Sequence, residues 1–298
     1  MPESKPPLLK IALLQHACVE DPAVNLRLVT DMVRDAAGQG AQLVVTQELF
    51  RSLYFCRTQD ADAFDGAEPI PGPTSQALGG LARELGITIS ASLFERRAAG
   101  LYHNTSVMLD PAGRVSGKYR KMHIPDDPSY LEKYYFTPGD LGFGSHPVAT
   151  ASSSPADVGM LVCWDQWFPE AARLTALQGA ELLLYPTAIG WHEDEPDAER
   201  HAQRDAWITI QRAHAIANGV FVAAVNRIGQ EGESIFWGSS FVADPMGRIL
   251  ARASADQPEI LIAEIDLAQV EHYRRHWNLF FRDRRHDAYG GITQQWGR

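Results

Sequence analysis

The spacing of apolar residues predicts alternating strands and helices at the start of the chain. Residues 8–15 are mostly apolar and predict a buried strand. Residues 25–37 carry apolar side chains at helical spacing, and two glycines, Gly38 and Gly40, end the pattern. Residues 42–46 form a second apolar run. A strand, a helix and a strand in this order predict a βαβ unit with a parallel pair.

Alternating strand and helix patterns continue along the rest of the chain. Helices are expected at 74–85, 205–217 and 267–275, and another begins at Pro169. Strands are expected at 87–93, 157–162, 220–226 and 259–265, and hairpins at 102–119 and 235–253. The region 123–143 is rich in proline, aspartate and aromatic residues and predicts a loop.

The second half of the sequence repeats short motifs of the first half. Gln39-Gly-Ala-Gln-Leu-Val-Val45 resembles Gln178-Gly-Ala-Glu-Leu-Leu-Leu184, and Asp110-Pro-Ala-Gly-Arg-Val115 resembles Asp244-Pro-Met-Gly-Arg-Ile249. Chance repetition of common strand and turn words is the alternative, but two matches in the same order argue against it. We therefore expect an α/β protein in which two similar halves form one domain, with two mixed sheets packed face to face and helices outside.

Composition and charge limit the classes of partner. The chain has 298 residues, of which 45% are hydrophobic and 21% charged, as in ordinary globular proteins. A formal net charge of −10 argues against nucleic acid and anionic membranes as partners and mildly favours cationic ligands. No apolar run is long enough to span a bilayer, and residues 1–10 lack a signal-peptide core.

The cysteines predict neither a disulfide framework nor a metal site. Cys18, Cys56 and Cys163 are odd in number and widely spaced, and no Cys/His pairing suggests zinc. We expect a cytoplasmic protein without a metal or an organic cofactor.

Cys163 lies at the expected end of a strand, before a helix that starts at Pro169. A side chain on such a turn faces a site, and backbone N–H groups nearby can bind an anion. A lone cysteine is more often a buried core residue. The polar and bulky neighbours Trp164, Asp165, Gln166 and Trp167 favour a functional site instead.

Glu48 and Lys121 also follow predicted strands. Taken singly, each has an ordinary alternative, because Glu48 could be a surface acid and Lys121 one basic residue among several. The three blocks Gln47-Glu48-Leu49, Gly117-Lys-Tyr-Arg-Lys121 and Cys163-Trp-Asp-Gln-Trp-Phe-Pro-Glu170, in this order, resemble the carbon–nitrogen hydrolases of the nitrilase superfamily. The resemblance extends from about residue 10 to residue 289.

This resemblance implies a four-layer αββα sandwich, which agrees with the two expected halves. It places a single hydrolase domain at residues 8–290. It also implies homo-oligomers built from dimers, and the charged, aromatic arm at residues 280–298 is expected at a subunit interface.

The family mechanism implies a role for each motif residue. Cys163 would be the nucleophile, Glu48 the general base and acid, and Lys121 the charge beside the oxyanion. Glu132 would orient Lys121 and contact the substrate. The implied substrate-binding residues are Tyr54, Trp164, Thr187 and Glu193. Cys163 is expected to have a lowered pKa.

Further motifs are Tyr54-Phe-Cys56, His123-Ile-Pro-Asp126 and Tyr185-Pro-Thr-Ala-Ile-Gly190. With them the chain most resembles, within the superfamily, the enzymes that hydrolyse N-carbamoylputrescine in polyamine biosynthesis, so a small carbamoyl amine is the expected substrate. Those relatives carry Ser-Glu-Pro after a Thr-Ala-Ile-Gly word, whereas this chain continues Trp191-His192-Glu193. Glu193 could supply the acid for a distal ammonium, or belong to a solvated acidic loop. Ala206 stands where the relatives have histidine.

Two other functions are kept as alternatives. The first is a hydrolase of N-carbamoyl-β-alanine or of an N-carbamoyl amino acid, whose carboxylate would need an arginine in the pocket. The second is a silent binding protein on the same fold, although such a protein has no reason to keep three reactive groups together.

Overall fold

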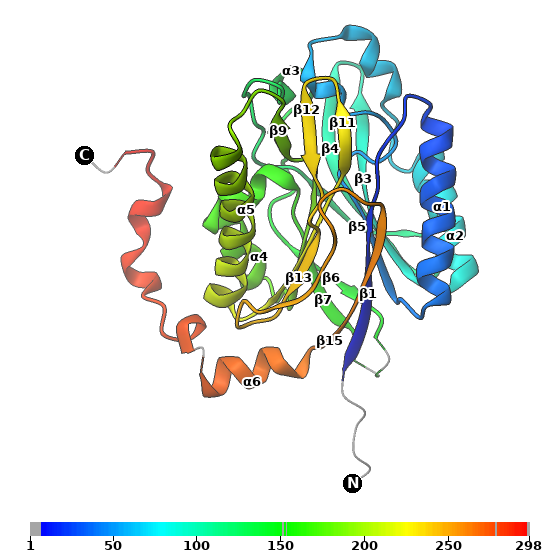
Figure 1. Ribbon diagram of the computed structural model, residues 1–298. Coiled ribbons are helices and arrows are strands. Elements are labelled where there is room, and N and C mark those ends of the chain that lie inside the picture. The colour runs from blue at the N-terminus through cyan, green and yellow to red at the C-terminus, as the bar shows by residue number, and fades with distance from the viewer. Residues whose placement is uncertain (1–6, 151, 153, 278, 297–298) are drawn as a thin grey trace.

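The chain forms two six-stranded sheets. Helices lie on the outer faces of these sheets (Figure 1). The computed structural model describes residues 7–150, 152, 154–277 and 279–296. The first sheet has the order β15 (Glu259–Asp266), β1 (Leu8–Gln15), β2 (Leu43–Thr46), β3 (Thr88–Ala98), β4 (Leu101–Leu109), β5 (Val115–Arg120). The second has the order β14 (Ile249–Arg252), β13 (Phe241–Ala243), β10 (Phe221–Asn226), β8 (Leu182–Thr187), β7 (Ala156–Met160), β6 (Ser145–Val148).

Each sheet has a parallel centre and an antiparallel hairpin at one edge. Strands β1, β2 and β3 are parallel, and β4 and β5 follow as a hairpin. Strands β7, β8 and β10 are parallel, and β13 and β14 follow in the same way. The two halves therefore have the same order of elements, which agrees with the repeated sequence words.

The helices cover opposite outer faces of the two sheets (Figure 1). On the first sheet they are α1 (Pro22–Gly38) and α2 (Pro73–Leu85), and on the second α4 (Pro169–Leu177) and α5 (Asp197–Asn218). Prolines at the first helical positions of α1, α2 and α4 fix where these helices begin. Gly86 and Gly219, both in the left-handed conformation, end α2 and α5.

Strand alternation separates two apolar cores. Along β1, Leu9, Ile11 and Leu13 face the second sheet, while Ala12 and Leu14 pack against α1 and α2. The four-layer αββα fold expected from the sequence is confirmed. None of the helices in the described ranges is long and apolar enough to cross a membrane.

A third, three-stranded sheet was missed by the sequence analysis. Its order is β11 (Ile228–Glu231), β12 (Ser234–Trp237), β9 (Gly190–His192). The expected continuous strand 235–243 is wrong, because it is divided between β12 of this sheet and β13 of the second sheet. Gly238 and Ser239 both have positive φ values, of 47° and 60°, so the chain turns sharply between the two strands.

The remaining elements are short or lie near the C-terminus. They are α3 (Glu132–Tyr135), α6 (Ala268–His276) and the 3₁₀ turns Phe55–Arg57, Ala61–Gly66, Cys163–Trp167, Leu279–Phe281, His286–Ala288 and Gly290–Thr293. Phe281 packs under the guanidinium groups of Arg173 and Arg274. Beyond Phe281 the chain runs along one side of the molecule (Figure 1), and Trp296 is 74% exposed. Residues 297–298 of the expected arm lie outside the described residues.

Gly159 on β7 tests how closely the second sheet packs on its helices. A Cβ atom at Gly159 would lie 2.2 Å from Cγ2 of Thr175 and 3.1 Å from Cδ2 of Leu183. Gly159→Ala should therefore lower the free energy of unfolding by about 1–3 kcal/mol, measured by urea denaturation. Gly80→Ala in α2 is the control, because its Cβ meets nothing within 4 Å and alanine favours helix by up to ~1 kcal/mol. Equal stabilities of the two variants would contradict the close packing.

Candidate active site

Three side chains that the sequence places far apart form one buried ionic cluster. Glu48 follows β2, Lys121 follows β5 and Glu132 begins α3, and all three are fully buried. The Lys121 Nζ atom lies 3.0 Å from Oε1 of Glu48 and 2.6 Å from Oε2 of Glu132. One ammonium group thus bridges two carboxylates away from water.

Further hydrogen bonds orient the two carboxylates. Asn104 on β4 donates from Nδ2 to Oε1 of Glu48 at 2.7 Å. The Tyr54 hydroxyl donates to Oε1 of Glu132 at 2.6 Å. The second oxygen of Glu48, Oε2, is buried and has no hydrogen-bond partner among the described residues, so it is free to accept a proton.

The charges in this cluster shift one another's protonation. Burial acts against the ammonium of Lys121, but the carboxylates of Glu132 and Glu48 raise its pKa well above the usual value. Burial also raises the pKa of Glu132 to about 7, against the attraction of Lys121. Two carboxylates facing one ammonium leave an excess negative charge, and the Glu48 carboxylate adds to the effect of burial on Glu132.

Cys163 lies beside this cluster at the start of a 3₁₀ turn. Its φ is +42°, a left-handed conformation that costs a non-glycine residue about 1–3 kcal/mol. Asp165 holds the turn, since its Oδ2 accepts the N–H of Val162 at 2.9 Å and the Tyr119 hydroxyl at 2.8 Å. Its Oδ1 accepts the N–H of His123 at 3.1 Å.

The expected lowering of the Cys163 pKa is wrong for this structure. Burial and the nearby Glu48 carboxylate raise the pKa of the thiol well above its usual value, and Lys121 only partly opposes them. The turn before Pro169 also prevents Cys163 from lying at the start of α4 itself. Cys163 is therefore a neutral thiol that must lose its proton to a base when it reacts.

A cavity of about 550 Å³ opens in front of Cys163. Its wall is largely aromatic, with Tyr130, Trp164, Trp167, Trp191 and Trp237. Besides Cys163 and Tyr130, the titratable side chains on it are Asp127, His192 and Glu195, and no described residue lining it is a lysine or an arginine. The cavity is thus suited to a small molecule with an apolar stem and a positive end.

The predicted substrate-binding residues occupy different places. Trp164 lines the cavity, whereas Tyr54 and Thr187 are buried outside its lining. Thr187 donates to Oε1 of Gln166 at 3.3 Å and to the carbonyl oxygen of Tyr185 at 3.0 Å. Glu193 is exposed and its carboxylate accepts from Nε2 of Gln230 at 3.2 Å, away from the lining.

Glu195 takes the place on the cavity wall that the sequence analysis gave to Glu193. It is half-buried, and its Oε2 atom is buried with no hydrogen-bond partner among the described residues. The signal was present in the dipeptide Glu195-Pro196, which matches Glu-Pro of the relatives' word after an insertion of three residues. Ala206, the other departure, also lines the cavity.

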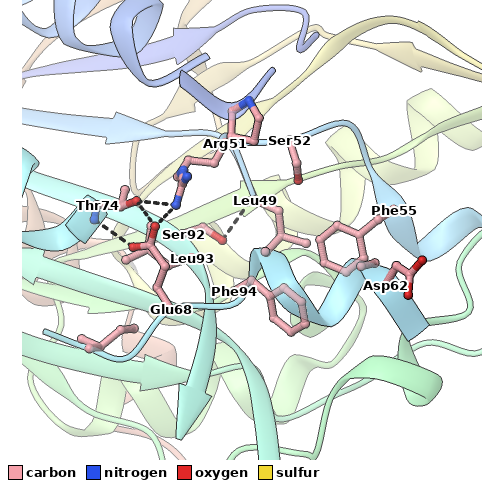
Figure 2. A pocket seen from close by; sticks show the side chains of 14 residues that line it. Leu49, Arg51, Ser52, Phe55, Asp62, Glu68, Thr74, Ser92, Leu93 and Phe94 are labelled. Carbon is pink, nitrogen blue, oxygen red and sulfur yellow. Dashed lines mark hydrogen bonds and ion pairs between the residues drawn. The ribbon is translucent and has the colours of Figure 1, made fainter. Parts of the chain in front are cut away.

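A second cavity, of about 220 Å³, is lined by Leu49, the residue that follows Glu48 (Figure 2). Leu49, Phe55 and Phe94 give it an apolar wall, and Arg51, Thr74 and Glu68 form a polar cluster beside them. Leu49 has φ +47°, so the residue after the candidate base is also in a left-handed conformation.

The groups around Cys163 are those of a thiol-based hydrolase: a thiol, a buried carboxylate to accept its proton, and an ammonium to face an oxyanion. No group of three metal-binding side chains is found in the described part of the chain.

Comparison with known proteins assigns the family. The chain matches the carbon–nitrogen hydrolase family over residues 10–275. It is 43% identical to an N-carbamoylputrescine amidase of Solanum lycopersicum, over 95% of this chain and 94% of that protein. It is 40% identical to a citrullinase of Francisella tularensis subsp. tularensis, over 97% of this chain and 99% of that protein.

A solved structure supports the same assignment. The crystal structure of a carbon–nitrogen hydrolase from Helicobacter pylori G27 superposes with a TM-score of 0.92 at 44% identity, covering 97% of this chain and 100% of that one. The chain belongs to the carbon–nitrogen hydrolase family, and it is a hydrolase that acts on amides. The resemblance inferred from the sequence is confirmed.

His16 provides a test of the buried polar region behind Glu48. Its backbone N–H donates to Oε1 of the Gln47 side chain, and burial lowers the pKa of its ring to about 4. The unfolded chain takes up a proton near pH 6.5 but the folded protein only near pH 4, so stability falls as the pH drops through this window.

Between pH 7 and pH 5 this residue should reduce the free energy of unfolding by about 2 kcal/mol. Urea denaturation of the wild type and of His16→Gln at both pH values measures the effect. The variant should lose that much less stability between the two pH values. Equal losses in both proteins would show that His16 is not buried in its neutral form.

Proposed function

We propose that this protein hydrolyses an N-carbamoyl amine with a positively charged distal end, of which N-carbamoylputrescine is the type. The observation that carries the proposal is the cavity before Cys163, which has acidic side chains and no lysine or arginine among the described residues lining it. The related protein of Solanum lycopersicum is named for the same substrate. The products would be putrescine, carbon dioxide and ammonia, in polyamine biosynthesis.

In the first half-reaction the Cys163 sulfur attacks the carbamoyl carbon while Glu48 takes the thiol proton. The free Oε2 atom of Glu48 supports this role. Lys121 and the backbone N–H of Trp164 stabilise the oxyanion. Glu48 then returns the proton to the leaving nitrogen, the carbon–nitrogen bond breaks, and the free amine departs. Cys163 is left as an S-carbamoyl thioester.

In the second half-reaction Glu48 removes a proton from water, and the resulting hydroxide attacks the thioester carbon. The carbon–sulfur bond breaks and Cys163 regains the proton. The released carbamic acid decomposes to carbon dioxide and ammonia. Glu132 keeps Lys121 in place throughout, which fits its 2.6 Å contact with the Nζ atom.

Specificity for a cationic end is assigned to Glu195. Its unpartnered Oε2 atom on the cavity wall can accept a charge-assisted hydrogen bond from an ammonium group. Tyr130 lies on the same cavity wall, and an aromatic face also favours a cation. Asp127 adds negative potential at the same cavity.

We also propose that the protein is a single-domain cytoplasmic enzyme that forms homo-oligomers built from dimers. The proposal of oligomers is supported by the C-terminal arm, where Phe280, Tyr289, Ile292 and Trp296 are all more than 40% exposed. Apolar side chains gathered on one segment are typical of an interface.

Replacing the nucleophile is the first test. Cys163→Ser should abolish turnover of N-carbamoylputrescine while leaving the thermal unfolding midpoint close to wild type, because a hydroxyl is a far poorer nucleophile here. Glu48→Gln and Lys121→Ala should each lower kcat by several orders of magnitude without additivity. Ammonia release measures turnover. A Cys163→Ser protein with near wild-type activity would refute the mechanism.

Replacing Glu195 tests the substrate class. Glu195→Gln should raise KM for N-carbamoylputrescine by about 30-fold, or roughly 2 kcal/mol, because the ammonium group loses its charged partner. A neutral carbamoyl alkylamine of equal length should change little. Glu193→Gln is the matched control on the same loop and should leave both substrates unchanged.

Two outcomes would overturn the assignment. If both substrates respond alike to Glu195→Gln, this carboxylate does not bind the distal amine. If the wild type prefers N-carbamoyl-β-alanine or citrulline over N-carbamoylputrescine, the substrate is a carbamoyl amino acid, as the similarity to the citrullinase would then explain.

A further inference from the structure

A buried ion pair outside the substrate cavity contacts two segments of the main chain. One segment carries Glu48, and the other carries Tyr54, whose hydroxyl binds Glu132. Arg227 lies between β10 and β11, and Glu231 is the last residue of β11. Nη1 of Arg227 lies 2.8 Å from Oε1 of Glu231, and their side chains are 0% and 3% exposed. Neither residue lines the cavity in front of Cys163.

Arg227 binds the turn that carries Glu48. Its Nη2 atom donates to the carbonyl oxygens of Glu48 at 2.8 Å and of Leu49 at 3.1 Å. Leu49 is in the left-handed conformation, so this turn needs external support to keep its shape.

Packing and hydrogen bonds together supply that support. Leu49 is 3% exposed and belongs to a buried apolar cluster, and its side chain also lines the 220 Å³ cavity of Figure 2. The Oγ atom of Ser92 accepts the N–H of Leu49 at 3.2 Å, and Arg227 holds the two carbonyl groups. Hydrogen bonds, with Arg227 as the charged donor, therefore help to fix the turn.

Glu231 binds the segment that orients the other acid. Its Oε2 atom accepts the backbone N–H of Tyr54 at 2.5 Å, and the Tyr54 hydroxyl donates to Glu132 at 2.6 Å. The guanidinium of Arg227 also lies over the ring of Tyr54, 5.8 Å from its centre. The ion pair thus acts on Glu48 through one main-chain segment and on Glu132 through another.

We propose that Arg227 and Glu231 are positioning residues, which set the spacing of Glu48 and Glu132 on either side of Lys121. The inference rests on the proposed function, because it assigns a purpose to that spacing. The pair touches neither substrate nor reacting atoms. Its loss should slow the chemical step while leaving the cavity wall, and hence substrate binding, largely intact.

The competing explanation is a purely structural ion pair, since removing one partner of any buried pair destabilises a protein. Kinetic constants separate the two. Arg227→Lys keeps the charge but not the fork that reaches Glu231 and two carbonyl groups at once. It should lower kcat for N-carbamoylputrescine by about 10²-fold, the effect of small misplacements in an active site, with KM within about twofold of wild type.

Glu231→Gln is the milder variant and keeps the test valid if Arg227→Lys fails to fold. It retains an oxygen for the Tyr54 N–H but loses the charged contact with Arg227, and should lower kcat on the order of tenfold. Asp244→Asn is the matched control, because Asp244 is also buried and pairs with an arginine four residues on, in the turn between β13 and β14. It should lower the unfolding midpoint but leave kcat unchanged.

A second measurement needs no substrate. The rate at which iodoacetamide alkylates Cys163, followed by mass spectrometry, depends on Glu48 as a base and should fall in Arg227→Lys and Glu231→Gln but not in Asp244→Asn. If the wild type does not hydrolyse N-carbamoylputrescine, the proposed function fails and the alkylation rates still test the positioning role. A folded Glu231→Gln protein with wild-type kcat, or with a wild-type alkylation rate where no substrate is turned over, overturns the inference.

Discussion

The buried ammonium of Lys121 is the constraint on which the rest of the site depends. A fully buried lysine is stable as a cation only beside carboxylates, and here it lies 2.6 Å from Glu132 and 3.0 Å from Glu48. Burial, together with the nearby Glu48 carboxylate, raises the pKa of Glu132 to about 7. The fold therefore holds one ammonium and two carboxylates away from water beside the thiol of Cys163.

Meeting that constraint requires three distant segments to end at one place. Glu48 and Lys121 follow two strands of the first sheet, and Cys163 follows a strand of the second. Leu49, which follows Glu48, and Cys163 itself have strained backbone conformations, with φ values of +47° and +42°. Such strain persists only where neighbouring groups hold it, as Asp165 does for Cys163.

The small third sheet joins the reacting groups to the substrate cavity. Its β9 strand carries Trp191 and His192 of the cavity wall, and the ion pair of Arg227 and Glu231 flanks its β11 strand. Part of the cavity wall and the ion pair that contacts the turn of Glu48 thus belong to one hydrogen-bonded sheet.

The sequence by itself determined the layers of this protein and the three reactive residue types. Strand and helix periodicity, proline at helix starts and the repeated Asp-Pro-x-Gly turns are local signals, so the αββα class could be predicted from them. Glu48, Lys121 and Cys163 were found because they follow strands and belong to recognisable words. The acid on the cavity wall is Glu195 and not the expected Glu193, and the sequence spacing of the loop between Gly190 and α5 did not reveal which of the two faces the cavity.

Only the tertiary structure decided how these groups affect one another. The pKa of Cys163 is raised because burial and a carboxylate outweigh Lys121, and no linear pattern reports burial from all sides. Arg227 is 106 positions away from Lys121 in the numbering, yet it holds the turn of Glu48 through two carbonyl groups. Backbone oxygens carry no sequence signal, so contacts to them become visible only when the chain is folded.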